Sequence, residues 1–400
     1  MAQYKMLDGN LAAVEAIKMA RVKVIAAYPI TPQSSISEKL SALVDSGELD
    51  AKCIRVESEH SAISCCVGAQ LTGVRTATAT SSVGLALMHE VLGVASGCRL
   101  PIVMPIVNRS LASPWSLWCD HQDTMAERDS GWIQIYCENV QDVYDSVIMA
   151  YRIAEHEDVL TPAMVCLDGF FLSHSMQKIS VPDQSEIDEF VGEYVPRNYY
   201  FDTSDPLMLD NLTGSDEVTE MKRQQAIGFS NAKCVVDEVY EEFGKKFGRT
   251  KYPAEGYRLE GAEAVIITLG SMSGTAKHVV DKLRSEGLSV GAVKISCFRP
   301  FPFERLAQLL GGVKKVAVLD RAIGTGAQGS PVWLEVRTAL GHETFVKSYI
   351  GGLGGRDVNI TTIEKVFSDI LADDGAGPRE PVWIDCKENF MDVRQVVFNV

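Results

Sequence analysis

The stretch VKVIAAYPITPQSSISEKLSALV, residues 22–44, decides the fold. It runs from an apolar segment, through a turn with Pro29 and Pro32, into a segment with the period of a helix. An apolar run followed by an amphipathic one is typical of a buried strand of a parallel sheet and its covering helix. Because open α/β sheets bind ligands where their parallel strands end, the turn YPITP is the first place to look for a site.

The same alternation continues through residues 1–171 and predicts one α/β domain. Four further strands are expected in KCIRVES (52–58), RTATATSS (75–82), LPIVMPIVN (100–108) and TPAMVCLDG (161–169). Helices are expected in EHSAISCCVGAQLTG (59–73), VGLALMHEVLGVASG (83–97) and DVYDSVIMAYRIAEH (142–156). Strand runs that are apolar throughout indicate a parallel sheet covered on both faces.

Beyond Leu172 the periodic pattern is lost, and residues 172–258 are expected to form an irregular arm and a long helix. The recurring Tyr, Phe, Leu and Met side chains favour an arm that lies on another surface over a disordered linker. A second, smaller parallel-sheet domain is expected over residues 259–372, where β-α-β units repeat, followed by a C-terminal tail, 373–400.

The segment GTGAQG, residues 324–329, matches the glycine pattern of dinucleotide-binding loops. That fingerprint also requires an acidic residue at the end of the next strand, and here the acid at about that distance precedes the strand FVKSYI. A glycine-rich turn is therefore the preferred interpretation.

Composition and charge exclude several classes of protein. The formal net charge of −15 argues against nucleic-acid and anionic-membrane surfaces. No run of roughly 18 apolar residues is present, and the N-terminal residues lack the pattern of a signal peptide, so a cytoplasmic protein is expected. The ten cysteines include no C-x-x-C pair, so we expect no iron–sulfur cluster on this chain.

Polar residues at the ends of the expected strands are the candidate site residues. Thr31 is predicted to cap the helix with Pro32 as its first residue, or else the capping box Ser35–Glu38 begins that helix one turn later. The free N–H groups of a helix N-terminus suit a carboxylate or phosphate ligand. A helix cap that binds no ligand is an equally good explanation of these residues.

Three further residues follow strands at the same edge. Arg109 comes directly after LPIVMPIVN, and it is either a carboxylate clamp or an exposed arginine paired with an acid. Glu59 opens the helix that follows KCIRVES, where the helix dipole alone favours an acid. Ser82 follows the third strand and can cap a helix, donate to a ligand, or both.

The segment SPWSLWCDHQDTMAERDSGW, residues 113–132, is the least regular part of the first domain. Asp120, His121 and Asp123 have the residue types of metal ligands, but such a triplet in a loop is more often a solvated turn, and no metal is predicted. Trp115 and Trp118 suggest a loop that closes over a pocket or presses against a partner.

Seven motifs together resemble one enzyme family. In chain order they are YPITPQSS, VESEHSA, TSSVGLALMHE, NRSLASPW, ERDSGWIQ, CFRPFP and GGLGG. The chain resembles the α subunit of the 2-oxoacid:ferredoxin oxidoreductases, of which the pyruvate enzyme is the best-known member. The resemblance implies a thiamine-diphosphate pyrimidine-type domain followed by a transketolase-C-terminal-like domain.

The resemblance also implies the reaction: oxidative decarboxylation of a 2-oxoacid to acyl-CoA and CO2, with electrons passed to ferredoxin. The GDG motif of the pyrophosphate and Mg²⁺ site is missing, so this chain would supply only the pyrimidine side. Mg²⁺ and 4Fe–4S clusters would then lie on partners: a thiamine-pyrophosphate-binding β subunit, a γ subunit and a ferredoxin-like δ subunit. A dimer of such heteromers is expected.

Site roles follow from the resemblance residue by residue. Glu59 matches the glutamate that bonds the aminopyrimidine, and Thr31 and Arg109 match contacts to the substrate carboxylate and keto oxygen. Adjacent cofactor contacts are assigned to Tyr28, Pro29 and Ser82, and a substrate contact to Asp120.

The substrate itself stays open in the sequence. Val83 departs from the glutamine often seen at that point of the family, which leaves the acid in doubt. Pyruvate is favoured, with an aryl glyoxylate, a branched-chain 2-oxoacid or oxalate as alternatives. A non-catalytic scaffold subunit is a further alternative, against which Glu59, Thr31 and Arg109 argue together.

Overall fold

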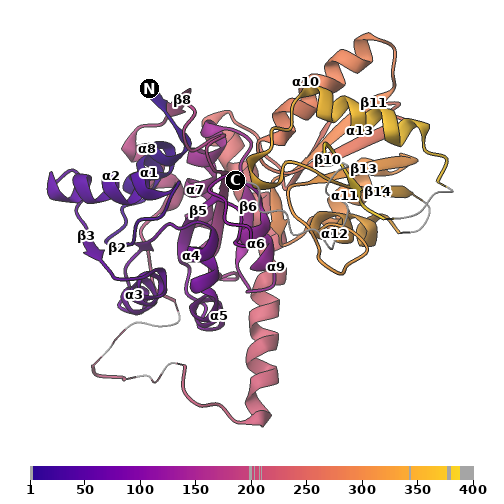
Figure 1. The fold of residues 1–400 in the computed structure, drawn as a ribbon. Helices are drawn as coiled ribbons and strands as arrows, with labels where there is room; N and C mark the ends of the chain where they lie inside the picture. Colours follow the sequence, from indigo (N-terminus) through magenta and orange to yellow (C-terminus); the bar gives the residue numbers. More distant parts are fainter. Residues whose placement is uncertain are drawn as a thin grey trace.

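The chain forms two α/β lobes joined by a long helix (Figure 1). We describe a computed structural model, and it describes residues 3–197, 201, 203–206, 208, 210–341, 344–375 and 380–387. The first lobe runs from β1 to α8 and the second from β9 to β15, and helix α9 (Ser215–Phe247) connects them.

The first lobe is built on a seven-stranded sheet in the order β12-β6-β7-β5-β4-β2-β3. Six of these strands are parallel, as predicted, and only β12, which comes from the second half of the chain, runs antiparallel. The strands are β2 (Val24–Ala27), β3 (Lys52–Arg55), β4 (Thr76–Ala77), β5 (Val103–Asn108), β6 (Ile133–Tyr136), β7 (Ala163–Asp168) and β12 (Cys297–Arg299).

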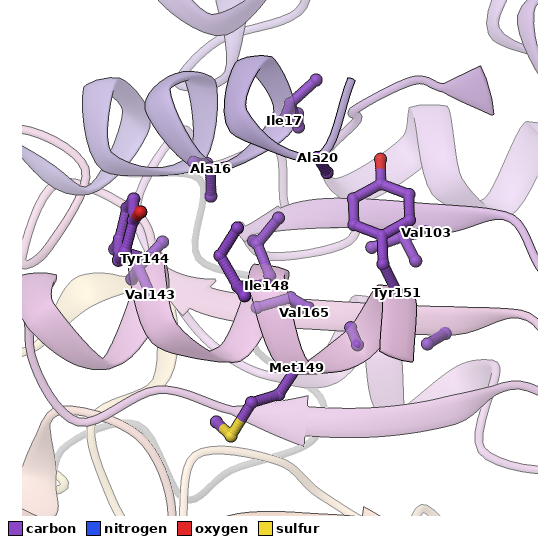
Figure 2. Packing of buried hydrophobic residues seen from close by; sticks show 14 of the residues in the cluster. Ala16, Ile17, Ala20, Val103, Val143, Tyr144, Ile148, Met149, Tyr151 and Val165 are labelled. Carbon is purple, nitrogen blue, oxygen red and sulfur yellow. The ribbon is translucent and has the colours of Figure 1, made fainter. Parts of the chain in front are cut away.

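Helices cover both faces of this sheet because its strands are apolar on both sides. One face holds α1 (Gly9–Met19), α2 (Ser34–Asp45) and α7 (Val140–Ala154). The other face holds α3 (Glu59–Leu71), α4 (Ser82–Leu87) and α5 (His89–Gly97). Figure 2 shows the first face, where small α1 residues such as Ala16 and Ala20 let the bulky Tyr144, Ile148 and Tyr151 of α7 approach closely.

The stretch predicted to be irregular from Leu172 is structured in its first part, which corrects that prediction. It holds β8 (Gln177–Val181), paired antiparallel with β1 (Gln3–Leu7), and α8 (Gln184–Val191). These elements are too short to give a clear period, although Asp183 and Glu186 form a capping box that marks the start of α8. Part of the remaining arm lies outside the described residues.

Two smaller differences concern the first sheet and its helices. The strand β6 was not recognised, because only four residues of WIQIY pair. The helix expected over 83–97 is two helices, α4 and α5, which meet at Met88.

The second lobe has a six-stranded sheet in the order β15-β14-β13-β10-β11-β9, parallel except for β9. The strands are β9 (Ala254–Tyr257), β10 (Ala264–Thr268), β11 (Val290–Ile295), β13 (Lys315–Asp320), β14 (Phe345–Ile350) and β15 (Val382–Trp383), and the helices are α10 (Met272–Ser285), α11 (Phe303–Leu310), α12 (Pro331–Leu340) and α13 (Ile360–Ala372).

The glycine-rich loop 324–329 forms a closed turn before α12. A Cβ on Gly324 would stand 2.6 Å from the carbonyl oxygen of Gly329.

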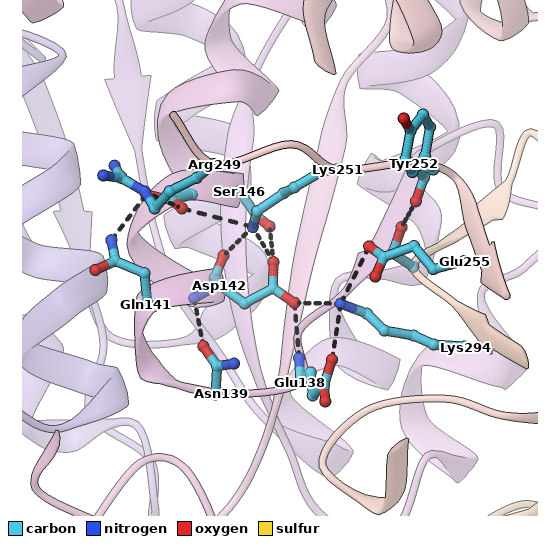
Figure 3. A network of polar contacts seen from close by, with 12 residues as sticks. Glu138, Asn139, Gln141, Asp142, Ser146, Arg249, Lys251, Tyr252, Glu255 and Lys294 are labelled. Carbon is cyan, nitrogen blue, oxygen red and sulfur yellow. Dashed lines mark hydrogen bonds and ion pairs between the residues drawn. The ribbon is translucent and has the colours of Figure 1, made fainter. Parts of the chain in front are cut away.

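A buried ion network links the two lobes (Figure 3). Lys294 of β11 is 5% exposed and lies 2.9 Å from Asp142 and 3.2 Å from Glu138, both on the first lobe. Asp142 also pairs with Lys251, which follows α9. Because each charge is matched by charges from the other side, this network fixes the second lobe against α7.

Candidate active site

The carboxyl ends of the parallel strands meet at one edge of the first sheet and bring the predicted residues together. Thr31 follows β2, Glu59 follows β3, Ser82 follows β4 and Arg109 follows β5. The helix after β2 lies on one face of the sheet and the helix after β4 on the other. The chain therefore diverges between these two neighbouring strands, which is the position of the ligand crevice in open α/β sheets.

Neither predicted cap of α2 is present. The helix begins at Ser34, with Gln33 as its N-cap residue and no side-chain cap hydrogen bond. Thr31 and Pro32 instead belong to a turn that precedes the helix. Pro32 therefore does not occupy the first helical position, and the Thr31 side chain, which is exposed, is not used as a cap.

The turn is held by two buried amides that sequence reasoning did not single out. Gln33 Oε1 accepts from the Ile30 N–H at 3.4 Å, and Asn10 Nδ2 of α1 donates to the Pro32 carbonyl at 2.8 Å. Both amide side chains are fully buried. No local pattern reveals the Asn10 contact, because Asn10 is 22 residues from its partner. They add to the prolines in fixing the position of Thr31.

Arg109 is the best-placed anion ligand of this edge. Its side chain is 4% exposed; Nη1 donates to the Thr31 carbonyl at 2.8 Å and Nε to the Ser116 carbonyl at 3.1 Å. No described residue accepts a hydrogen bond from Nη2. Burial lowers the pKa of this guanidinium from its usual value, with Asp123 opposing the change. The second terminal nitrogen is thus free for a carboxylate.

Glu59 is the first residue of α3, and Ser58 caps that helix through the Ser61 N–H. Its side chain is 7% exposed, yet within the described chain nothing donates a hydrogen bond to the carboxylate. Glu59 Oε1 and Thr80 Oγ1 each lie 2.5 Å from the point where a Cβ on Gly84 would stand. Because Gly84 has no Cβ, the Glu59 carboxylate and the Thr80 hydroxyl pack directly against the backbone of α4, and the Thr80 hydroxyl also lacks a partner.

Asp123 joins the segments that carry these residues, a role the sequence did not reveal. Its Oδ2 accepts from the backbone N–H groups of Ser82 and Arg109, each at 3.0 Å, and its Oδ1 accepts from Asn108 Nδ2 at 2.8 Å. Burial raises the pKa of Asp123 to about 6, although the hydrogen bonds from Asn108, Arg109 and Ser82 lower it. The carboxylate therefore ties the start of α4 to the Arg109 segment.

The three predicted cofactor contacts differ in availability. Ser82 has a φ of +52°, and its hydroxyl donates to the Ser110 carbonyl, so that hydroxyl is already engaged. Its neighbour Ser81 has a buried hydroxyl without a partner. Tyr28 is half-buried and Pro29 exposed in the turn after β2.

Asp120, predicted to contact substrate, is buried, and its carboxylate is occupied by protein donors. Its Oδ2 accepts from the Ser110 hydroxyl and from the Gly354 N–H at 3.1 Å, and its Oδ1 accepts from the Gln122 N–H at 3.0 Å. The Gly354 bond comes from the second lobe. Asp120 thus supports the loop that carries Arg109.

Three neighbouring buried residues have the types of metal ligands. Possible ligand atoms of Cys119, His121 and Asp168 all lie within 4.8 Å of one another. His121 Nε2 lies 2.8 Å from Asp168 Oδ1, and Arg321 Nη1 lies 3.7 Å from Asp168 Oδ2. Burial alone would raise the pKa of Asp168, but His121 and Arg321 hold it well below its usual value. Because the guanidinium already supplies the positive charge, we assign no metal here.

Both tryptophans of the 113–132 segment are exposed, Trp115 at 78% and Trp118 at 54%. Trp118 packs on Phe170 with 4.6 Å between ring centroids. Their contact with a pocket or a partner stays a prediction.

Comparison with known proteins identifies the family. Residues 15–241 match the model described as pyruvate flavodoxin/ferredoxin oxidoreductase, thiamine diphosphate-binding, and residues 262–363 match pyruvate:ferredoxin oxidoreductase core domain II. Pyruvate synthase subunit PorA of Methanocaldococcus jannaschii is 46% identical over 97% of this chain and 99% of its own length. The ketoisovalerate oxidoreductase subunit VorA of Pyrococcus horikoshii is 43% identical, over 96% and 98%.

A third relative is the α subunit of NADH-dependent phenylglyoxylate dehydrogenase from Aromatoleum evansii, 42% identical over 95% of this chain and 94% of its own length. The fold matches a 2-oxoglutarate:ferredoxin oxidoreductase from Magnetococcus marinus, with a TM-score of 0.73 at 21% identity over 92% of this chain and 65% of the other.

The chain belongs to the pyruvate:ferredoxin oxidoreductase family, the family that its motifs indicated. It is accordingly a subunit of a thiamine-diphosphate-dependent 2-oxoacid oxidoreductase, active as part of a complex. Within the part of the chain that the structure describes, no helix has the length and apolar character needed to cross a membrane.

Proposed function

We propose that this chain supplies the pyrimidine-side half of the active site of a pyruvate:ferredoxin oxidoreductase. Two free groups at one sheet edge carry the proposal: the unpartnered Glu59 carboxylate and the unpartnered Arg109 Nη2. A scaffold subunit has no use for ionisable groups that are largely removed from solvent and keep an atom without a protein partner. Pyruvate is favoured, since the PorA relatives have the highest identity among those named here.

The residues around Glu59 fit an aminopyrimidine ring. Glu59 and Thr80 place two neighbouring oxygens without protein partners against Gly84 near the start of α4. When bound, thiamine diphosphate supplies the carbon nucleophile that adds to the keto carbon and takes up the electron pair left by CO2. Glu59 would hold a proton between its Oε1 and a ring nitrogen, which makes it the acid–base group of this half-site.

Arg109 and Thr31 would orient the 2-oxoacid. Arg109 is fixed by two of its nitrogens and presents the third, so its charge is preorganised for the substrate carboxylate. The exposed Thr31 hydroxyl lies on the residue whose carbonyl Arg109 contacts, and it can donate a second hydrogen bond. Tyr28, Pro29 and Ser81 or Ser82 would border the cofactor, and Asp120 would act by supporting the Arg109 loop.

The other parts of the enzyme would lie on partner chains: Mg²⁺ and the pyrophosphate site on a β subunit, 4Fe–4S clusters on further subunits including a ferredoxin-like δ subunit, and a γ subunit. We propose a cytoplasmic dimer of such heteromers that uses CoA and ferredoxin. We expect the purified chain alone to be colourless and to bind thiamine diphosphate and Mg²⁺ weakly, because half the site is absent. A stoichiometric cluster on the lone chain, seen by its visible absorbance, would contradict this assignment.

The substrate is tested on the native complex, purified through a tag on this chain. Reduction of a viologen dye is measured with CoA and a panel of pyruvate, 2-oxoisovalerate, phenylglyoxylate and oxalate. The highest kcat/KM is expected for pyruvate. If phenylglyoxylate or 2-oxoisovalerate is preferred, the proposed reaction is kept and the assignment of pyruvate as substrate is wrong. If no 2-oxoacid reduces the dye, the proposed activity is wrong.

A further inference from the structure

The loop that carries the proposed substrate clamp is not held by its own lobe alone. Within the loop, residues 109–121, Ser110 N–H donates to the Trp118 carbonyl at 3.0 Å and Arg109 Nε to the Ser116 carbonyl. Between these contacts residues 112–118 form no helix or strand. A segment without regular structure needs outside contacts to place an arginine accurately.

The second lobe supplies those contacts. The Gly355 N–H donates to the Cys119 carbonyl at 2.6 Å, and the Gly354 N–H donates to the Asp120 carboxylate at 3.1 Å. The His121 N–H in turn donates to the Arg321 carbonyl at 2.9 Å.

A fourth contact between the lobes is made by Gln122, one residue beyond the loop. The Gln122 side chain exchanges two hydrogen bonds with the backbone of Ile323, at 3.0 and 3.2 Å. Two connections of the second lobe, those after β13 and β14, thus hold residues 119–122 through main-chain groups.

The approach of the two lobes requires glycine at position 355. Its φ is +75°, and a Cβ there would stand 2.4 Å from the Cβ of Trp118. Trp118 packs on Phe170, which follows Gly169, and a Cβ on Gly169 would stand 3.0 Å from Pro32 Cγ. Close packing therefore continues from the second lobe through Trp118 to the turn that carries Thr31.

We propose that the second lobe positions the substrate clamp, with Gly354, Gly355 and Gln122 as positioning residues for Arg109. This inference rests on the proposed function of Arg109. It gives the transketolase-like lobe a task in substrate binding although none of its residues would touch the substrate. Displacing a clamp by about 1 Å can lower a rate by about 10², so a small movement of this loop should be measurable.

The test compares Gly355→Ala with Gly47→Ala in the native complex. Gly47 has nearly the same φ, +77°, but nothing lies within 4 Å of its missing Cβ, so this control shares the backbone strain without the clash. Gly355→Ala should raise KM for the 2-oxoacid at least tenfold relative to the control. KM for CoA and thiamine diphosphate affinity should match the control.

A second variant covers the case in which Gly355→Ala does not assemble. Gln122→Ala removes two bonds to the second lobe without adding an atom, and it should raise KM for the 2-oxoacid several-fold. If Gly355→Ala matches Gly47→Ala, or if it fails to assemble and Gln122→Ala keeps the wild-type KM, the inference is refuted. Either result leaves the proposed function intact as long as Arg109→Ala is impaired, whereas an unimpaired Arg109→Ala refutes the clamp itself.

Discussion

At the scale of single residues, Glu59 and Glu57 are two acids beside one helix start with different surroundings. Glu57 is exposed and accepts a hydrogen bond from the Ser61 hydroxyl, whereas Glu59 is buried without a donor. A helix dipole explains an acid at either position, but burial without a partner points to a ligand. The comparison also supplies a matched control.

Glu59→Gln should lower turnover of the native complex by about 10² or more, the usual size of lost acid–base assistance. The amide keeps the shape of the side chain, so subunit assembly and Tm should match the wild type. Steady-state dye reduction and exchange of the cofactor C2 proton by NMR should slow together. Glu57→Gln, the control, should leave both rates unchanged. If Glu59→Gln keeps the wild-type rates, Glu59 is not an acid–base group and serves only the helix start.

Arg109→Ala should lower kcat/KM far more than Thr31→Val. Removing the partner of a desolvated carboxylate costs about 2–5 kcal/mol, whereas one neutral hydrogen bond contributes about 0.5–1.5 kcal/mol. Arg109→Lys should restore only part of the loss, since an ammonium cannot reproduce the planar fork that also bonds the carbonyls of Thr31 and Ser116. The measurement is kcat/KM for the best 2-oxoacid, with cofactor occupancy checked in each variant.

At the scale of elements, one carboxylate joins the strand β5 to the helix α4. Asp123 accepts hydrogen bonds from Ser82, the first residue of α4, and from Asn108 and Arg109 at the end of β5. Asp123→Asn replaces an acceptor oxygen by a donor that faces N–H groups. We expect a loss of about 1–3 kcal/mol in the free energy of unfolding at pH 8, by urea denaturation.

The pH dependence of that loss has a definite sign. The folded-state pKa of Asp123, about 6, lies above the ordinary value of 3.8, so the folded chain binds this proton more tightly than the unfolded chain. The wild type therefore gains stability from this group as the pH falls from 7 to 5, by about 1 kcal/mol. Asparagine cannot titrate, so the gap between variant and wild type should widen over that range. A constant gap would contradict a raised pKa, and Asp129→Asn, at an exposed position, is the control.

At the scale of the whole molecule, the two lobes are held together by charge as well as by apolar packing. Lys294→Met leaves the buried Asp142 and the partly buried Glu138 without one of their cations, and breaking a buried pair costs about 3–5 kcal/mol. Lys282→Met, at an exposed pair with Glu364, should change stability little. Urea denaturation at pH 7 distinguishes the two, and equal losses would mean that the network does not join the lobes.

The contribution of this network should be present across the neutral range. The pKa of Asp142 is lowered in the folded state, since Lys251 and Lys294 outweigh the effect of burial, so its contribution is lost only as the pH falls below about 4. The pKa of Lys294 is raised, because the nearby carboxylates outweigh burial, so its contribution is lost only at strongly alkaline pH.

The sequence by itself determined the architecture of both lobes. The strands β2, β3, β5, β7, β10, β11 and β13 and most of their helices lie where the apolar and helical periods predict them. Such periods are local, because each residue's burial depends on its place in one strand or helix. Among the elements that were missed, β6, β8 and α8 are short, and a short run carries too little period to be recognised.

Only the tertiary structure decided which polar side chains at the sheet edge are free. The sequence named Glu59, Ser82, Arg109 and Asp120 as site residues without showing which of them have free atoms, but the structure engages the Ser82 hydroxyl and the Asp120 carboxylate and leaves Glu59 and one nitrogen of Arg109 open. Only the tertiary structure likewise shows that Asn10 supports the turn after β2. The physical reason is that hydrogen-bond partners come from distant parts of the chain, as far as 234 residues between Asp120 and Gly354, and no local pattern records them.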